Sequence, residues 1–150
     1  MEVNPQELVK ILSDNIKLYE HLGITVQELN SHHAIFKVSL QKNLNHKGTA
    51  FGGSIYAAGV MSAYALVLAG LKAYKIPTEN IVIAKGSIEY HRPVETDFEV
   101  HCAFPSLDQE QAFYNELQTK GRVKSELKVQ ILGDGGSLRA SLIGLFVVKM

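Results

Sequence analysis

The 150-residue chain has no tryptophan, a single cysteine, four prolines and no net charge, because 15 Lys and Arg are balanced by 15 Asp and Glu. The lone Cys102 cannot form an internal disulfide, which suits a reducing compartment, and we expect the protein in the cytoplasm. A chain without net charge has no global field that attracts nucleic acid or an acidic membrane surface. We therefore expect neither as a partner.

Charge is also missing from residues 53–71, a stretch long enough for a transmembrane helix. A membrane span, a buried structural helix and the floor of an active site are the three interpretations. Ten of these residues are Gly, Ala or Ser, a composition weak in the large apolar side chains that drive membrane insertion. Segments with alternating strand patterns flank the stretch on both sides. We therefore predict a helix buried in protein.

Six segments show the patterns of β-strands: residues 24–29, 33–40, 81–92, 97–104, 123–131 and 137–149. The glycine-rich turn at 133–136 predicts that the last two form a hairpin. We expect the first two segments to pair with each other, and the middle two to pair around Pro93. One domain over residues 1–150 is the expectation for a chain of this length.

Two further helices are predicted, one at the N-terminus and one over residues 108–120. The first has Asn4 as N-cap and Pro5 at its first position. Its apolar residues lie on one side: Leu8, Ile11, Leu12 and Tyr19. The N-terminal segment also has acids and a proline where a signal peptide would be basic and then apolar, so we do not expect one. An all-round apolar helix must be enclosed, and a curved antiparallel sheet can enclose it, which predicts an α+β fold.

This arrangement resembles the hotdog fold over nearly the whole chain. The segment NHKGTAFGG, residues 45–53, is similar to the sequence at the start of the central helix in acyl-CoA thioesterases. The segment YHRPV, residues 90–94, is similar to the proline-terminated third strand of that superfamily. The combination most resembles the YiiD C-terminal type of thioesterase domain. The resemblance implies an acyl thioester hydrolase of fatty acid metabolism that acts on acyl-CoA or acyl carrier protein.

Gly52 and Gly53 begin the long helix, where the first amide N–H groups have no partner within the helix. These donors, with the positive end of the helix dipole behind them, can bind an oxyanion, and the missing side chains leave room for a thioester carbonyl. The resemblance assigns the oxyanion to the N–H of Gly53. The alternative is that the glycines only permit a tight entry into the helix or close packing.

The resemblance also implies that Asn45 helps to place the attacking water. The histidine of the family signature is replaced here by Phe51, and Val60 stands where a carboxylate usually lies on the helix. No acid or histidine lies between residues 48 and 71, so the helix cannot supply a general base. Ser54 is a candidate for positioning water or substrate. For Ser62 we expect a bond back to its own helix.

Strand parity predicts that the even-numbered residues from Val82 to Arg92 face the helix, and that Glu89 and His91 face away from it. Arg92 could then meet a carboxylate, a phosphate or the thioester oxygen at the pocket mouth, or extend into solvent. The histidines show no metal-ligand spacing, and no nucleotide-binding loop is present. We predict no metal and no cofactor.

We expect the acyl chain to bind between helix residues such as Tyr56 and Val60 and a neighbouring strand. Exposed sheet edges and the resemblance predict a homodimer, which could pair again into a tetramer. Its site would lie where the Gly52 and Gly53 turn of one subunit meets the sheet of the other. A noncatalytic acyl-binding or carrier-docking module is the alternative. A dehydratase would need a histidine paired with an acid across the interface, and no such pair stands at the expected places.

Overall fold

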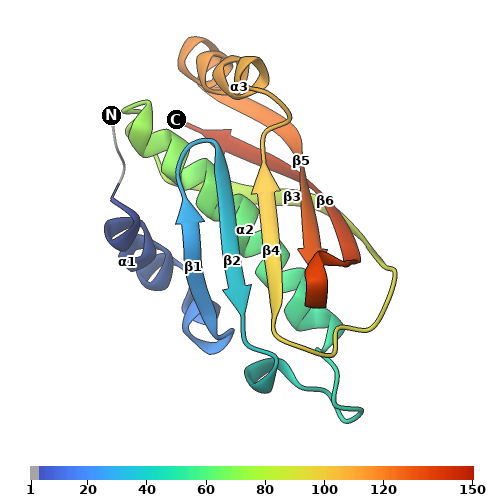
Figure 1. Ribbon diagram of the computed structural model, residues 1–150. Helices are drawn as coiled ribbons and strands as arrows, with labels where there is room; N and C mark the ends of the chain where they lie inside the picture. Colours follow the sequence, from blue (N-terminus) through green and yellow to red (C-terminus); the bar gives the residue numbers. More distant parts are fainter. Residues whose placement is uncertain (1–3) are drawn as a thin grey trace.

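The computed structural model describes residues 4–150, and in it one long helix lies against a six-stranded antiparallel sheet (Figure 1). Residues 1–3 of the N-terminal segment lie outside the described residues. The elements follow in this order: α1 (Pro5–Asn15), η1 (Lys17–His21), β1 (Ile24–Leu29), β2 (His33–Val38), η2 (Gln41–Asn43), α2 (Gly52–Ala73), β3 (Asn80–Tyr90), β4 (Phe98–Ala103), α3 (Leu107–Lys120), β5 (Arg122–Leu132), η3 (Asp134–Gly136) and β6 (Leu138–Lys149). All six predicted strands and all three predicted helices are present.

The strands are ordered β1-β2-β4-β5-β6-β3 across the sheet. The predicted hairpins β1/β2 and β5/β6 are confirmed, but the predicted pairing of β3 with β4 is wrong. β3 pairs with β6 at one edge, and β4 lies between β2 and β5. The reason is the connection through residues 91–97, which passes the start of α2, where the N–H of Ala50 donates to the carbonyl of Val94 at 2.9 Å. This segment carries the chain from the edge to the middle of the sheet.

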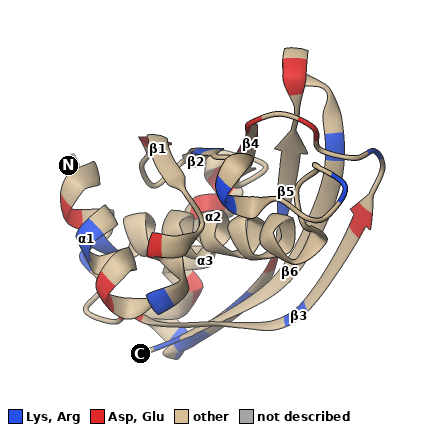
Figure 2. Cartoon of the chain, turned by 90° about the horizontal axis from the view of Figure 1, so that it is seen from below, with Lys and Arg blue, Asp and Glu red and all other residues tan. Residues whose placement is uncertain are grey.

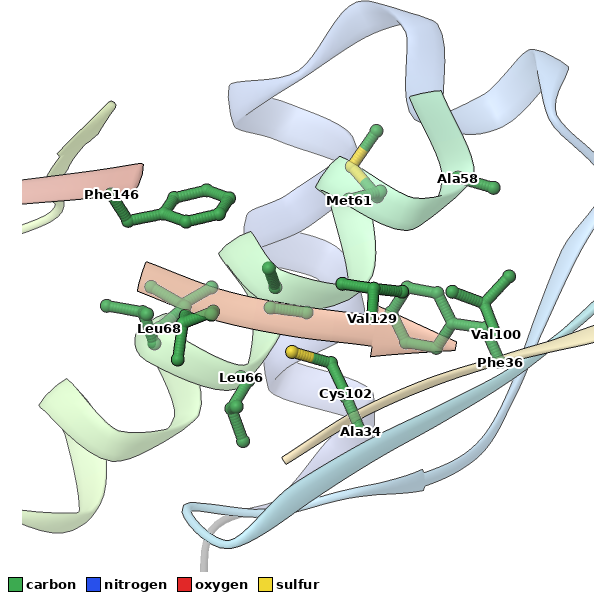
Figure 3. Close-up of a cluster of buried hydrophobic side chains, with 14 of the residues drawn as sticks. Ala34, Phe36, Ala58, Met61, Leu66, Leu68, Val100, Cys102, Val129 and Phe146 are labelled. Atoms are coloured by element: carbon green, nitrogen blue, oxygen red, sulfur yellow. The ribbon is translucent and has the colours of Figure 1, made fainter. Parts of the chain in front are cut away.

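The core forms where α2 packs on the inner face of the sheet (Figure 3). Every second residue of the central strands points toward the helix, as the alternation predicts. The fully buried examples include Ala34, Phe36 and Val38 of β2, Phe98 and Val100 of β4, and Leu127, Val129 and Ile131 of β5. By length and composition α2 would pass as a membrane span, but 72% of its most apolar 18-residue window is buried inside the protein. It is the core helix of the sheet.

Small residues on α2 let its neighbours approach the backbone. A Cβ on Gly59 would lie 2.8 Å from Cδ2 of Leu142 in β6. A Cβ on Gly70 would overlap the ring of Tyr114, whose hydroxyl donates to the carbonyl of Val67 at 3.2 Å. The glycines therefore fix how closely the sheet and α3 pack on the central helix.

The N-terminal helix begins as the sequence predicts, with the Asn4 side chain accepting a hydrogen bond from the N–H of Gln6 at 2.9 Å. It ends at Asn15, earlier than the apolar spacing suggests, and Tyr19 lies in the following 3₁₀ turn. Tyr19 is still buried, so the apolar side continues across the break. In Figure 1 the helix lies beside the edge strand β1.

Two groups with raised pKa values, the buried Cys102 and the half-buried Tyr74, make the stability of the fold sensitive to alkaline pH. Burial raises the pKa of the Cys102 thiol from 9.0 to about 12. Burial, together with the hydrogen bond and charge of Glu110, raises the pKa of Tyr74 from 10.0 to about 12. A raised pKa means that the folded state prefers the protonated form. Its stabilisation is complete below the unfolded pKa, about 9 to 10, and is lost as the pH approaches 12.

We therefore expect the free energy of unfolding to fall between pH 9 and 12, on the order of 4 kcal/mol from Cys102 alone at about 1.4 kcal/mol per pKa unit. Urea titrations at successive pH values measure the decrease. The C102A variant is the control, because it lacks the thiol and should lose less stability over the same range. Identical pH profiles for the two proteins would contradict the assignment.

Candidate active site

The start of α2 presents two backbone donors without partners. Phe51, the N-cap residue, makes no capping bond with its side chain, and its carbonyl accepts from the N–H groups of Ser54 at 3.0 Å and Ile55 at 3.1 Å. Among residues 4–150, no hydrogen bond is made by the N–H of Gly52 or Gly53. Figure 2 shows that α2 carries almost no charge along its length; its one charged residue is Lys72 in the last turn. The partial positive charge of the helix N-terminus is therefore not neutralised by an acid on the same helix.

Two exposed aromatic side chains flank this helix start. The hydroxyl of Tyr90, at the end of β3, donates to the carbonyl of Gly52 at 2.8 Å. Partial burial raises the pKa of Tyr90, with a smaller effect of Tyr56, so its hydroxyl keeps the proton that it donates. The ring of Phe51 lies over Gly53, where an added Cβ would be 2.5 Å from Cε2 of the ring. Sequence reasoning assigned Tyr90 no role in the site, although strand parity had turned it toward the helix.

Asn45 holds the turn that precedes the helix. Its side-chain oxygen accepts from the N–H groups of Lys47 at 2.9 Å and Thr49 at 3.1 Å, and its amide nitrogen donates to the hydroxyl of Thr49 at 2.7 Å. Both lone pairs of the oxygen are thus used, and one amide hydrogen is left. In this conformation Asn45 can donate to a water molecule but has no acceptor site for one.

An apolar groove of about 640 Å³ runs along α2 beside β3. It is lined by Asn15, Ile16, Leu18, Tyr56, Ala57, Val60, Met61, Tyr64, Ile81, Val82, Ile83 and Phe146. Tyr56 and Val60 therefore lie beside a neighbouring strand; that the acyl chain binds between them stays a prediction. The groove residues of α2 follow Gly53 at intervals of three and four, so Gly53 lies on the same face of the helix.

The predicted parity of β3 holds for only part of the strand. Gly86, Ile88 and Tyr90 pair with inward-facing residues of β6, as the parity predicts. Nearer the start of the strand, a β-bulge between Ile83 and Lys85 shifts the register. Ile81 and Ile83 are therefore the inward residues there, and the predicted inward orientation of Val82 and Ala84 is wrong, since both are exposed. Because of the bulge, Ile81 and Ile83 face the groove.

The other predicted polar residues are dispersed around the site. β3 ends at Tyr90, so strand parity does not extend to Arg92, which is exposed and makes no side-chain hydrogen bond within residues 4–150. His91 contacts the hydroxyl of Ser141 at 3.0 Å, on the outer side of the sheet. Ser54 is half-buried in the first turn of α2, and Ser62 bonds back to the carbonyl of Gly59 at 2.7 Å, as predicted.

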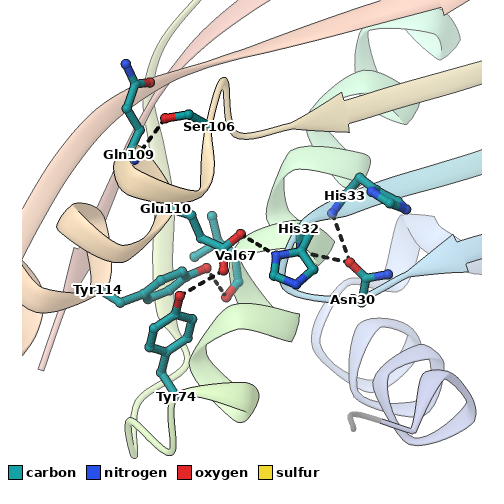
Figure 4. A network of polar contacts seen from close by, with 9 residues as sticks. All are labelled: Asn30, His32, His33, Val67, Tyr74, Ser106, Gln109, Glu110 and Tyr114. Atoms are coloured by element: carbon teal, nitrogen blue, oxygen red, sulfur yellow. Dashed lines mark hydrogen bonds and ion pairs between the residues drawn. The ribbon is translucent and has the colours of Figure 1, made fainter. Parts of the chain in front are cut away.

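A buried carboxylate lies at the other end of α2 (Figure 4). Glu110 is only 1% exposed; its oxygens contact Nδ1 of His32 at 2.8 Å and accept from the hydroxyl of Tyr74 at 2.8 Å. The rings of Tyr74 and Tyr114 stack with their centroids 4.5 Å apart. Sequence reasoning missed this network, because its members are far apart in the chain. Tyr74 caps the C-terminus of the 22-residue helix, roughly 30 Å from Gly53, so Glu110 cannot act as a base there.

An antiparallel sheet that wraps around one long apolar helix is the arrangement of the hotdog fold. The family model described as "Putative thioesterase (yiiD_Cterm)" matches residues 5–150, and the chain belongs to this family. The resemblance seen in residues 45–53 and 90–94 is thereby confirmed. None of the curated proteins matches the chain.

Several solved structures share the fold. A "putative thioesterase" from Shewanella oneidensis is 25% identical, with a TM-score of 0.84 over 97% of this chain and 96% of its own. A protein of unknown function from Chlorobaculum tepidum TLS is 24% identical, with a TM-score of 0.88 over 96% and 93%. A "probable thioesterase" from Pseudomonas aeruginosa is 15% identical, with a TM-score of 0.83 over 99% and 97%. The last two similarities concern the fold alone.

Proposed function

We propose that the protein binds the acyl thioester of coenzyme A or of acyl carrier protein at the start of α2 and hydrolyses it. One observation carries the proposal: the free N–H of Gly53 lies one helical turn before Tyr56, the first helix residue that lines the apolar groove, on the same face of the helix. A thioester substrate needs both features, a donor for its carbonyl oxygen and an apolar surface for its chain. The family membership supports the reaction class.

In the proposed reaction, water attacks the thioester carbon and the carbonyl oxygen gains negative charge. The N–H of Gly53 donates to this oxyanion, and the helix dipole, equivalent to about half a unit charge, stabilises it further. Phe51 and Ser54 border the bound carbonyl, and Gly52 leaves space for it. Arg92 is proposed to meet an anionic group of the carrier. The thiolate of the carrier then leaves and takes up a proton.

The attacking water is proposed to be held by the remaining amide hydrogen of Asn45. Because the Asn45 oxygen has no free lone pair, the amide cannot accept the proton of this water. The groove side of α2 also supplies no proton acceptor, because Val60 and its neighbours are apolar. The proton acceptor must therefore come from a loop, a strand or a second subunit.

A homodimer is part of the proposal, with a dimer of dimers as the larger alternative. β3 is an edge strand of 11 residues, and unpaired edges favour pairing with a second copy. Pairing there would bring a second sheet beside the groove and the glycine turn. Sedimentation equilibrium of the purified protein should give twice or four times the chain mass of 16.5 kDa, and a monomer would contradict this expectation. The cytoplasmic location stays a prediction.

Release of free thiol from acyl-CoAs and acyl carrier proteins of increasing chain length tests the proposed hydrolysis. A chromogenic thiol reagent reports turnover, and calorimetry on the same compounds reports binding. We expect saturable thiol release for at least one chain length. A protein that neither binds nor cleaves any acyl thioester would overturn the proposal.

A noncatalytic acyl-binding or carrier-docking module is the second candidate. It is favoured by the absence of acids and histidines from residues 48–71 and by the engagement of Asn45 in its own turn. Tight binding of acyl thioesters without thiol release would identify this function.

A further inference from the structure

We call the end of the groove nearest Gly53 its head and the end at Tyr64 its foot. Its floor is the helix stripe Tyr56, Ala57, Val60, Met61 and Tyr64, which continues the helix face of Gly53. β3 runs beside it in the opposite direction: the hydroxyl of Tyr56 lies against Gly86, and Ile81 and Ile83 are farther along the groove. An occupant that starts at Gly53 therefore follows the helix toward Tyr64.

Polar and charged groups terminate the groove at Tyr64. The amide nitrogen of Asn15, at the end of α1, donates to the Tyr64 hydroxyl at 3.3 Å and to Glu79 at 3.2 Å. The other oxygen of Glu79 pairs with Lys72 at 2.8 Å, and both contacts lower the pKa of Glu79, so that it is ionised at neutral pH. A methylene chain that continued past Tyr64 would displace water from this ion pair without replacing its hydrogen bonds. The foot of the groove is therefore unfavourable for an apolar chain.

We infer that Tyr64, held by Asn15, limits the substrate to acyl chains of up to about twelve carbons. This inference rests on the proposed function. Gly53 and Tyr64 are 11 residues apart on one helix face, a rise of roughly 16 Å. An extended hydrocarbon with bonds of about 1.5 Å advances about 1.3 Å per carbon, so about twelve carbons fill the distance. Shorter chains leave part of the groove unfilled, and longer chains meet the Tyr64 ring.

The experiment measures kcat/KM and the dissociation constant for saturated acyl-CoAs from four to sixteen carbons. For the unchanged protein we expect both parameters to improve up to about twelve carbons, and kcat/KM to fall at least about tenfold at sixteen. The Y64A variant removes the ring but leaves the ion pair of Lys72 and Glu79, so it should restore part of the lost activity at sixteen carbons. The Y64F variant keeps the ring and should keep the limit. V60F narrows the middle of the groove and should lower the limit to about six to eight carbons.

The outcomes separate this inference from the proposed function. Turnover that does not depend on chain length, or a limit that neither Y64A nor V60F moves, overturns the inference and leaves the hydrolase intact. A limit seen in binding without thiol release supports the inference and replaces the hydrolase by the binding module. Failure to bind any chain overturns both.

Discussion

Replacing Gly53 with proline is expected to lower kcat for thioester hydrolysis by about 10²–10³-fold, the usual effect of removing one oxyanion donor. Proline lacks the N–H but is tolerated in the first turn of a helix, so the fold should survive. Circular dichroism and the native mass of the variant, compared with that of the unchanged protein, check that it does. The kinetic measurement is thiol release at saturating substrate.

The matched control for this variant is G53A, which keeps the N–H. Its new Cβ would lie 2.5 Å from the Phe51 ring, which is 58% exposed and can rotate away. We expect G53A to lose far less activity than G53P. Equal losses in the two variants would show that space at residue 53, and not its hydrogen bond, matters for the reaction.

Replacing Gly70 with alanine is expected to lower the free energy of unfolding by about 3 kcal/mol, the upper range for overpacking a core. The new Cβ would overlap the ring of Tyr114, which is fully buried between α2 and α3 and cannot move into solvent. Urea denaturation monitored by circular dichroism measures the change.

The double variant G70A/Y114L tests the cause. Leucine does not fill the space that the tyrosine ring occupies. The G70A substitution should therefore lower the free energy of unfolding much less in the Y114L background than in the unchanged protein. If the two substitutions are additive, the clash between residues 70 and 114 is not the source of the instability, and the packing of α3 on α2 differs from the one described.

Much of the fold could be predicted from the sequence, because a helix or strand that is buried on one face has apolar residues at regular intervals. The alternation in residues 123–131 gave a strand of the correct parity, and the uncharged run 53–71 gave the enclosed helix. Strand order was harder, since β3 and β4 are neighbours in sequence but are separated by two strands, β5 and β6, in the sheet. Their connection depends on a backbone contact with Ala50, which no local pattern records.

The candidate site also has some features that the sequence predicts and others that it does not. The glycine pair and Tyr56 are recognisable because residue type and helical spacing carry the information. The bulge at Ile83 is not, because a single extra residue exchanges the two faces of the strand without changing its composition. Nor is the contact between His32 and Glu110, whose 78-residue separation is closed only by the packing of α3.

A structure of the protein with a nonhydrolysable acyl-CoA analogue, in which a methylene ketone replaces the thioester, tests the account most directly. The account predicts that the ketone oxygen lies about 2.7–3.1 Å from the N atom of Gly53 and that the alkyl chain extends between α2 and β3 toward Tyr64. A ketone bound elsewhere, with the Gly53 N–H facing solvent or covered by the Phe51 ring, would contradict it.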